Sequence, residues 1–229
     1  MDGFRHEEKF FISTASARML QGRLRAALGR DGHAGEDGRY FIRSLYFDDY
    51  QQSGLFDKIE GVEKREKYRI RFYDMDDRYI RLELKQKLGS LTRKRSAPLT
   101  REQADAILAG DTWPLWDSDD PLLRNFYLKA RTRLLRPTVI VDYMREAYVF
   151  RDVRITLDSD LHSGQYRTDL FSPEPYTLPV LPGDRLVLEV KYDDALPYAV
   201  RQLLRPLSAA RCAISKYELC RGQIGRAHV

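Results

Sequence analysis

The chain has 229 residues, of which 43% are hydrophobic and 32% are charged, with 39 basic and 34 acidic side chains. The charges are spread along the chain, which excludes a basic tail or arm, and the net charge of +5 mildly favours an anionic partner. Two cysteines exclude a disulfide framework, and no stretch approaches the ~18 apolar residues that span a bilayer. We expect one domain over residues 1–229, in the cytoplasm and without a signal peptide.

In the first half of the chain, strand patterns dominate. Alternation predicts a strand over Arg5–Ile12, and helical spacing behind a Ser/Thr start predicts a helix over Ser16–Leu28. The glycine-rich stretch Gly29–Gly38 is predicted to be a loop. Period-two alternation then predicts four further strands at Phe41–Phe47, Glu66–Tyr73, Arg78–Lys87 and Leu91–Ser96.

The second half mixes helices and strands. Thr100–Ala109 begins with the capping-box pattern, in which Gln103 holds the return position, and Asp111–Asp120 is predicted to be a loop. Further helices are predicted over Leu122–Leu134 and over Pro197–Leu207, and we expect the latter to pack outside the sheet. The remaining strands are predicted at Thr138–Tyr143, Ala147–Phe150, Arg154–Asp158 and Arg185–Lys191. Many strands with few helices predict an α+β fold with one large, closed or nearly closed antiparallel sheet.

The polar faces of these strands consist almost entirely of charged residues. Lys67, Arg69 and Arg71 share one face of their strand, because side chains alternate with a period of two. Arg81, Glu83, Lys85 and Lys87 do the same on the next strand. In a closed barrel one face must point inward, so these cations would converge on one volume. Such a cluster requires a polyanion or acidic partners, and phosphate chains match Arg forks and Lys charges well.

Acidic residues accompany the cations. Glu7, Glu83 and Glu189 each stand two positions before a lysine, at Lys9, Lys85 and Lys191. Each carboxylate could form a cross-strand ion pair. Alternatively, one or two of them coordinate Mg²⁺ or Mn²⁺, hard ions that prefer carboxylate oxygens and bridge phosphate oxygens.

A series of segments resembles the catalytic domain of the vacuolar transporter chaperone (VTC) family. The likeness runs in order from Arg5 to about Leu219. The segments are Glu7-x-Lys9, Ser44–Asp48, Lys67–Arg71, Leu82–Lys85, Lys94–Thr100, Tyr143–Tyr148, Val153–Asp158, Leu188–Lys191 and Ser215–Tyr217.

The resemblance implies a triphosphate tunnel metalloenzyme, that is, a closed eight-stranded antiparallel β-barrel with peripheral helices around a basic tunnel. It also implies a polyphosphate polymerase that transfers the γ-phosphate of ATP onto polyphosphate with Mn²⁺ or Mg²⁺. Glu189 would hold the metal, with Glu83 as a second acidic group. The implied phosphate-binding residues are Lys9, Arg69, Arg71, Lys85, Lys94, Arg145, Arg154, Lys191 and Lys216. The implied catalytic residues are Arg69, Arg71, Lys85, Arg145, Arg154 and Glu189.

The chain departs from the pattern in two ways. Many tunnel enzymes begin with Glu-x-Glu-x-Lys, whereas Arg5 replaces the first glutamate here, which fits the VTC branch best. Eukaryotic synthases also carry a phosphate-sensing domain and a membrane segment, and we expect neither in this chain. Coupling of synthesis to membrane transport would therefore need a membrane-protein partner.

Two other functions remain open. The same tunnel could hydrolyse inorganic triphosphate or nucleoside triphosphates, because residue types alone do not distinguish water from phosphate as the acceptor. It could also be a non-catalytic module that binds an anion, either polyphosphate or nucleic acid. Specific nucleic-acid binding is not expected, because Tyr68 and Phe72 alternate onto the face opposite the cations.

Overall fold

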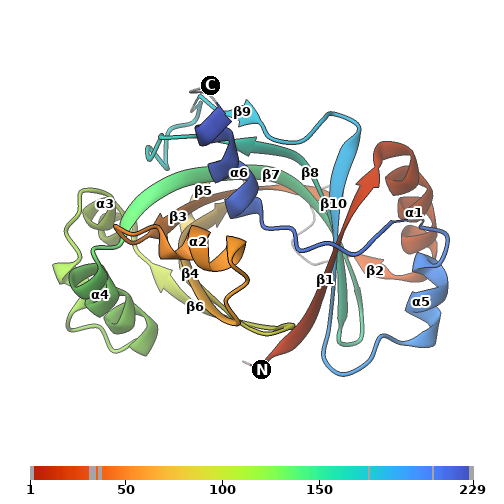
Figure 1. Cartoon of the computed structure of the whole chain (residues 1–229), viewed down its shortest axis with the longest axis horizontal. Coiled ribbons are helices and arrows are strands. Elements are labelled where there is room, and N and C mark those ends of the chain that lie inside the picture. Colours follow the sequence, from red (N-terminus) through yellow and green to blue (C-terminus); the bar gives the residue numbers. More distant parts are fainter. Residues whose placement is uncertain (1–2, 31–34, 36–37, 175, 208, 227–229) are drawn as a thin grey trace.

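The computed structural model describes residues 3–30, 35, 38–174, 176–207 and 209–226. Antiparallel strands close into a ring of eight, because β8 pairs back onto β7 (Figure 1). Around the ring the strands are β7 (Arg136–Phe150), β3 (Arg39–Asp48), β4 (Lys64–Tyr73), β5 (Asp76–Leu88), β6 (Leu91–Leu99), β1 (Arg5–Ser13), β10 (Arg185–Tyr192) and β8 (Val153–Ser163). The short strands β2 (Gly29–Arg30) and β9 (Leu178–Pro179) pair with β7 and β8. The predicted α+β fold with a closed eight-stranded barrel is confirmed.

Helices connect the strands. They are α1 (Thr14–Ala27), α2 (Ser53–Ile59), α3 (Arg101–Leu108), the 3₁₀ helix η1 (Trp113–Leu115), α4 (Pro121–Arg133), α5 (Tyr198–Leu204) and α6 (Lys216–Arg226). The predicted capping box is present, with Thr100 accepting from the Gln103 backbone and the Gln103 side chain accepting from the Thr100 backbone. None of the described helices combines the length and the apolar composition needed to cross a bilayer.

Apolar residues cover much of the outer face of the ring. Ile70 and Leu82 pack against Phe126 of α4, and α3 joins the same cluster. On the opposite side of the molecule, α1 and α5 cover β8 and β10 (Figure 1). Hydrophobic burial beneath these helices therefore turns the charged strand faces inward.

The final helix differs from the others because it reaches the inner face of the barrel. Tyr217 and Cys220 of α6 pack on Ile42 and Val141, which share the inward faces of β3 and β7. The side chain of Tyr217 also donates a hydrogen bond to Asp48 at the end of β3. This apolar cluster fills one part of the interior, so the charged residues occupy the remainder.

Several predicted boundaries were wrong. Thr138–Tyr143 and Ala147–Phe150 belong to one continuous strand, β7. Their alternation is interrupted because Arg145 pairs inward with Asp158 while Glu146 pairs with α1, which buries charge on both faces. The helices α2 and α6 were not predicted, because both sequences contain glycine, which lowers helix propensity.

Other predictions hold with shorter bounds. The helix predicted over Pro197–Leu207 is α5, and it packs outside the sheet against α1, as expected. The loop predicted over Asp111–Asp120 contains η1. The loop predicted over Gly29–Gly38 begins with β2, and its residues 31–34 and 36–37 lie outside the described residues.

Beside β1, the barrel wall is formed partly by β6 and partly by the segment that precedes α6. This strand pairs with β6 only at Arg5 and His6. Further along, a segment that precedes α6 runs beside β1, where Phe10 forms a bridge with Arg211. The Cys212 backbone nitrogen donates to the Lys9 carbonyl at 2.9 Å. The C-terminal segment therefore lies against the barrel wall where the direct pairing of β1 with β6 ends.

Candidate functional site

The inward faces of β4 and β5 place charged residues in direct register. Arg69 stands opposite Glu83, and Lys67 stands opposite Lys85. Because every second residue of a strand points inward, the cations of β4 follow one another at intervals of about 6.6 Å. The two strands thus present one row of charges along the interior.

Glu83 is the centre of one group of ion pairs. Its carboxylate lies 2.7 Å from Arg69 Nε, 3.7 Å from Arg71 Nη1 and 2.9 Å from Lys94 Nζ. Only 1% of the Glu83 residue surface is exposed. Burial alone raises the pKa of this carboxyl, but the three cations outweigh burial and hold the pKa well below its ordinary value.

Arg71 is fixed by further hydrogen bonds. Its Nε atom donates to Ser44 Oγ, and its Nη2 atom donates to the Tyr143 hydroxyl, both at 2.9 Å. The Tyr143 ring also lies beside Arg145, 5.2 Å from the guanidinium carbon, and beside Lys216, 5.0 Å from the ammonium nitrogen. Tyr143 therefore joins the group around Glu83 to a second group of charges.

Glu189 is the centre of the second group. Its Oε1 atom lies 2.6 Å from Lys216 Nζ and 3.5 Å from Lys9 Nζ. Its Oε2 atom lies 3.3 Å from Lys191 Nζ and 3.8 Å from Arg145 Nη2. Burial raises the pKa of the Glu189 carboxyl, but the surrounding cations outweigh it and hold the pKa well below its ordinary value.

Asp158 completes this second group. Its carboxylate accepts two hydrogen bonds from Arg145, at 2.6 and 2.7 Å, and lies 2.6 Å from Lys216 Nζ. The residue is fully buried. Burial raises the pKa of the Asp158 carboxyl, yet Arg145 and Lys216 bring it below its ordinary value. The bidentate geometry holds the Arg145 guanidinium in one plane.

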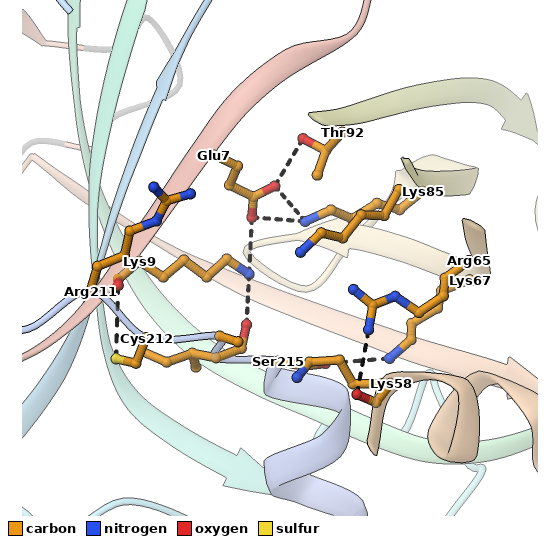
Figure 2. A pocket seen from close by; sticks show the side chains of 13 residues that line it. Glu7, Lys9, Lys58, Arg65, Lys67, Lys85, Thr92, Arg211, Cys212 and Ser215 are labelled. Carbon is orange, nitrogen blue, oxygen red and sulfur yellow. Dashed lines mark hydrogen bonds and ion pairs between the residues drawn. The ribbon is translucent and has the colours of Figure 1, made fainter. Parts of the chain in front are cut away.

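Glu7 continues the network toward the end of the barrel (Figure 2). Its carboxylate accepts from Lys85 at 2.8 Å and from Thr92 at 3.1 Å, and it lies 2.9 Å from Lys9 Nζ. Burial lowers the pKa of Lys85 to about 7, even though Glu7 acts in the opposite direction. We define the inner cluster as Glu7, Glu83, Asp158 and Glu189 together with Lys9, Arg69, Arg71, Lys85, Lys94, Arg145, Lys191 and Lys216.

A cavity of about 480 Å³ opens beside Glu7, Lys9 and Lys85. Its wall comes from β1, β4, β5 and β6, from α2 and from the segment before α6 (Figure 2). We call it the outer cavity. Its lining contains one acidic side chain, Glu7, and many basic ones, which are Lys9, Lys58, Arg65, Lys67, Lys85, Lys87 and Arg211.

The structure brings the predicted phosphate-binding residues to one interior. Arg154 of β8 stands opposite Lys191 of β10 and donates to the Tyr40 hydroxyl at 3.0 Å. Its side chain therefore points into the same interior. Lys94 lies nearer to solvent than the others, with 53% of its side chain exposed. The catalytic and binding roles of all these residues stay predictions.

Sequence reasoning missed several members of the site. Asp158 is two positions after Thr156 and four after Arg154, so the period of two would have indicated that it shares the inward face of Arg154. No comparable pattern indicated Tyr143 or Arg211. Tyr143 lies on a strand face that mixes apolar and charged residues, and Arg211 follows the last strand.

The acidic residues fit a divalent ion in a limited way. The described residues contain no group of three or more His, Cys, Asp or Glu side chains that could hold a metal. Glu189 supplies hard carboxylate oxygens, although each oxygen contacts two cations. This arrangement suits an ion that takes one carboxylate and completes its shell with phosphate oxygens and water, as Mg²⁺ commonly does.

Comparisons with known proteins agree with this architecture. The family model described as VTC domain matches residues 4–223. The chain has no significant match among curated protein sequences.

Solved structures with the same fold differ widely in sequence. A candidate adenylate cyclase from Bacillus halodurans is 16% identical, with a TM-score of 0.55 and coverage of 94% of this chain and 96% of that one. The candidate adenylyl cyclase HpAC1 from Hippeastrum, described as having a dominant triphosphatase activity, is 14% identical, with a TM-score of 0.57 and coverage of 96% of both chains. A chain of the Schizosaccharomyces pombe Mediator head module is 10% identical, with a TM-score of 0.51 and coverage of 91% and 98%. At these identities the likeness shows the fold alone.

Proposed function

The chain belongs to the VTC domain family, and from this premise we propose that it is a metal-dependent phosphotransferase that moves the γ-phosphate of ATP onto polyphosphate inside the barrel. The observation that carries the proposal is the inner cluster. Cations from β1, β4, β5, β6, β7, β10 and α6 converge there within a closed ring. A triphosphate or polyphosphate is the ligand whose charge density fits such a set.

Phosphoryl transfer depends on alignment and on neutralising the charge of the transferring group. Arg69 and Arg145 are held in fixed orientations by Glu83 and Asp158, so their remaining N–H groups are preorganised to bind phosphate oxygens. In this proposal Arg71, Lys85 and Arg154 bind the same phosphate chain from neighbouring strands, with Lys9, Lys94, Lys191 and Lys216 around it. Although burial acts in the opposite direction, nearby carboxylates raise the pKa values of Lys9 and Lys216 above the ordinary value, so these two ammonium groups stay protonated until the substrate arrives.

A divalent ion, Mn²⁺ or Mg²⁺, would be held by Glu189, with Glu83 as a second candidate, and would supply charge neutralisation at phosphate oxygens. Because Lys9 and Lys216 contact the same Glu189 oxygen, the substrate must attract these lysines before that oxygen is available. Substrate and metal would therefore bind together.

A triphosphatase is the second candidate, since water could replace the polyphosphate acceptor in the same tunnel. The description of HpAC1 as having a dominant triphosphatase activity favours keeping this alternative. A non-catalytic module for polyphosphate is the third, because the same cations could bind the anion without turnover and a fold alone does not fix a function.

Product analysis separates the three. Purified protein is incubated with ATP, Mn²⁺ and a short polyphosphate primer, and the products are sized on a gel. We expect the primer to lengthen, and we expect Arg71→Ala and Glu189→Gln to reduce turnover by about 10²–10³-fold, the usual effect of losing one charge-stabilising group. Thermal melting verifies that both variants remain folded.

Arg78→Ala is the matched control, because Arg78 is highly exposed and pairs with Asp76. Its turnover should equal that of the wild type. Release of phosphate without chain growth would replace the polymerase with the triphosphatase. Undiminished chain growth in both Arg71→Ala and Glu189→Gln would contradict the proposed site.

A further inference from the structure

Three cations of the outer cavity differ from those of the inner cluster. Within the part of the chain that the structure describes, Arg65, Lys67 and Lys87 have no carboxylate at ion-pair distance. Arg65 makes only long hydrogen bonds to backbone carbonyls, 3.5 Å to Asp57 and 3.4 Å to Lys58. Positive charge is therefore concentrated here without an equivalent acidic partner.

Lys67 is held by weak contacts. Its Nζ atom donates to Ser215 Oγ at 3.4 Å and stands 4.5 Å from the centre of the Tyr217 ring, over its face (Figure 2 shows the bond to Ser215). Ser215 belongs to the segment that leads into α6, and Tyr217 lies in the first turn of that helix. A stronger acceptor in the cavity could take this ammonium group without breaking an ion pair.

These residues continue the row of charges that begins in the inner cluster. Along the inward face of β4, Arg71 and Arg69 contact Glu83, whereas Lys67 and Arg65 follow at the next two inward positions. Lys87 stands directly opposite Arg65 on β5. The cationic row therefore extends beyond the acidic residues that balance its inner part.

The lowered pKa values of Lys67 and Lys87 also fit a cavity that binds an anion. Burial lowers the pKa of Lys67 to about 7; Asp48 and Glu218 act in the opposite direction, and the charges of Lys9 and Arg65 add to the lowering. Burial and the charge of Arg65 likewise lower the pKa of Lys87. Phosphate in the cavity would reverse both effects, because an opposite charge nearby favours the protonated amine.

We propose that the outer cavity is a second phosphate subsite, which binds the part of a polyphosphate chain that extends beyond a triphosphate. Arg65, Lys67 and Lys87 are its chain-length-determining residues. The identity of the ligand rests on the proposed function, and the position of the subsite rests on the unbalanced cations.

The size and position of the cavity fit this role. Its volume of about 480 Å³ lies in the usual range for sites that hold a small ligand, roughly 300–1,000 Å³. Glu7, Lys9 and Lys85 belong to both the cavity and the inner cluster, so one chain can contact both. A smaller hollow of about 160 Å³ shares Arg65 and Lys87 with the outer cavity and adds Lys64, Glu66 and Arg93.

Calorimetric titration without ATP or metal tests the subsite, with tripolyphosphate and long-chain polyphosphate as the two ligands. The variant is Lys67→Gln/Lys87→Gln. We expect its affinity for the long chain to fall about tenfold and its affinity for tripolyphosphate to stay within about twofold. The slope of log affinity against log salt should fall by roughly 0.7–0.9 per lost contact, for the long chain only.

Arg18→Gln/Arg23→Gln is the matched control, because both arginines are exposed on α1 and their loss changes the net charge equally. It should bind both ligands like the wild type. An equal loss for both ligands, or no loss for either, would overturn the proposal, as would a control that loses the same affinity.

The two single variants, Lys67→Gln and Lys87→Gln, repeat the measurement with smaller perturbations should the double variant melt early. The subsite and the proposed reaction fail in different ways. Binding is measured without turnover, so a protein that does not lengthen a primer can still show the chain-length effect. Conversely, a polymerase in which this effect is absent would retain the proposed function and lose only the subsite.

Discussion

The inner cluster and the outer cavity share the inward faces of β4 and β5 but differ in how positive charge is balanced. In the inner cluster, buried carboxylates such as Glu83 and Asp158 hold the cations at fixed positions. In the outer cavity, Lys67 and Lys87 lie near other cations without such partners among the described residues. One face of the same two strands therefore has a balanced part and an unbalanced part.

This difference has a physical consequence. Balanced cations such as Arg69 and Arg145 keep their orientation without ligand, which suits groups that must align a reacting phosphate. Unbalanced cations gain most from an arriving anion, since the ligand removes their mutual repulsion. Under the proposed function, preorganisation and ligand capture would belong to neighbouring stretches of β4 and β5.

The largest expected effect on stability comes from breaking the balance inside. Asp158→Asn leaves Arg145 and Lys216 with Glu189 as their remaining acidic contact. Removing one partner of a buried ion pair typically costs about 3–5 kcal/mol, and we expect a loss of that size in the free energy of unfolding. Urea denaturation measures it.

Added tripolyphosphate should restore part of the melting temperature of Asp158→Asn, because phosphate supplies the missing negative charge. A loss below about 1 kcal/mol would show that the inner carboxylates do not balance the cations in the way described here.

Changes in pH should affect the stability of the two regions in the same direction but over different pH ranges. Glu83, Asp158 and Glu189 have lowered pKa values, so the stability that they contribute is present above their unfolded values near pH 4 and is lost as the pH falls. Lys67 has a pKa lowered to about 7, so its charge destabilises the fold below that pH, and the penalty fades as the pH rises toward 10.5.

Lys67→Gln should therefore be more stable than the wild type at pH 6, and this advantage should shrink by pH 9. Thermal melting across that range measures the difference. An advantage that is constant with pH, or a variant that is less stable at pH 6, would mean that Lys67 is not a buried, unbalanced cation.

The smallest effect on the free energy of unfolding is expected at Lys94, where the inner cluster meets solvent. Lys94 contacts Glu83 at 2.9 Å, but 53% of its side chain is exposed, whereas the corresponding value for Lys216 is 7%. Lys94→Gln should change the free energy of unfolding by only about 0–1 kcal/mol. Lys216→Gln should cost clearly more, and equal losses in urea denaturation would remove the distinction between exposed and buried pairs.

Much of the site was predictable because alternation is a local property. The period of two placed Arg69, Arg71 and Glu83 on one face before any partner was known. The resemblance to the VTC family added Arg145 and Lys216, and the structure brings both to the same interior. Their roles in binding and catalysis remain for the assays above.

Other features could not be predicted from local patterns. The alternation pattern did not predict that β7 is one continuous strand. Arg145 and Glu146 are adjacent charged residues that are buried on opposite faces, whereas a strand with one exposed face would bury only one of them. The contribution of the segment around Arg211 depends on its position beside β1, about two hundred residues earlier in the chain.

By itself, the sequence determined which side chains share a face, since the backbone geometry of a strand alternates them without reference to the rest of the chain. Only the tertiary structure decided which face became the interior and which cations received a carboxylate. Those outcomes depend on ring closure, which places Glu7 beside Lys85 and Lys216 beside Asp158, and on the helices that cover the apolar outer face. Such contacts link distant segments, so no local pattern encodes them.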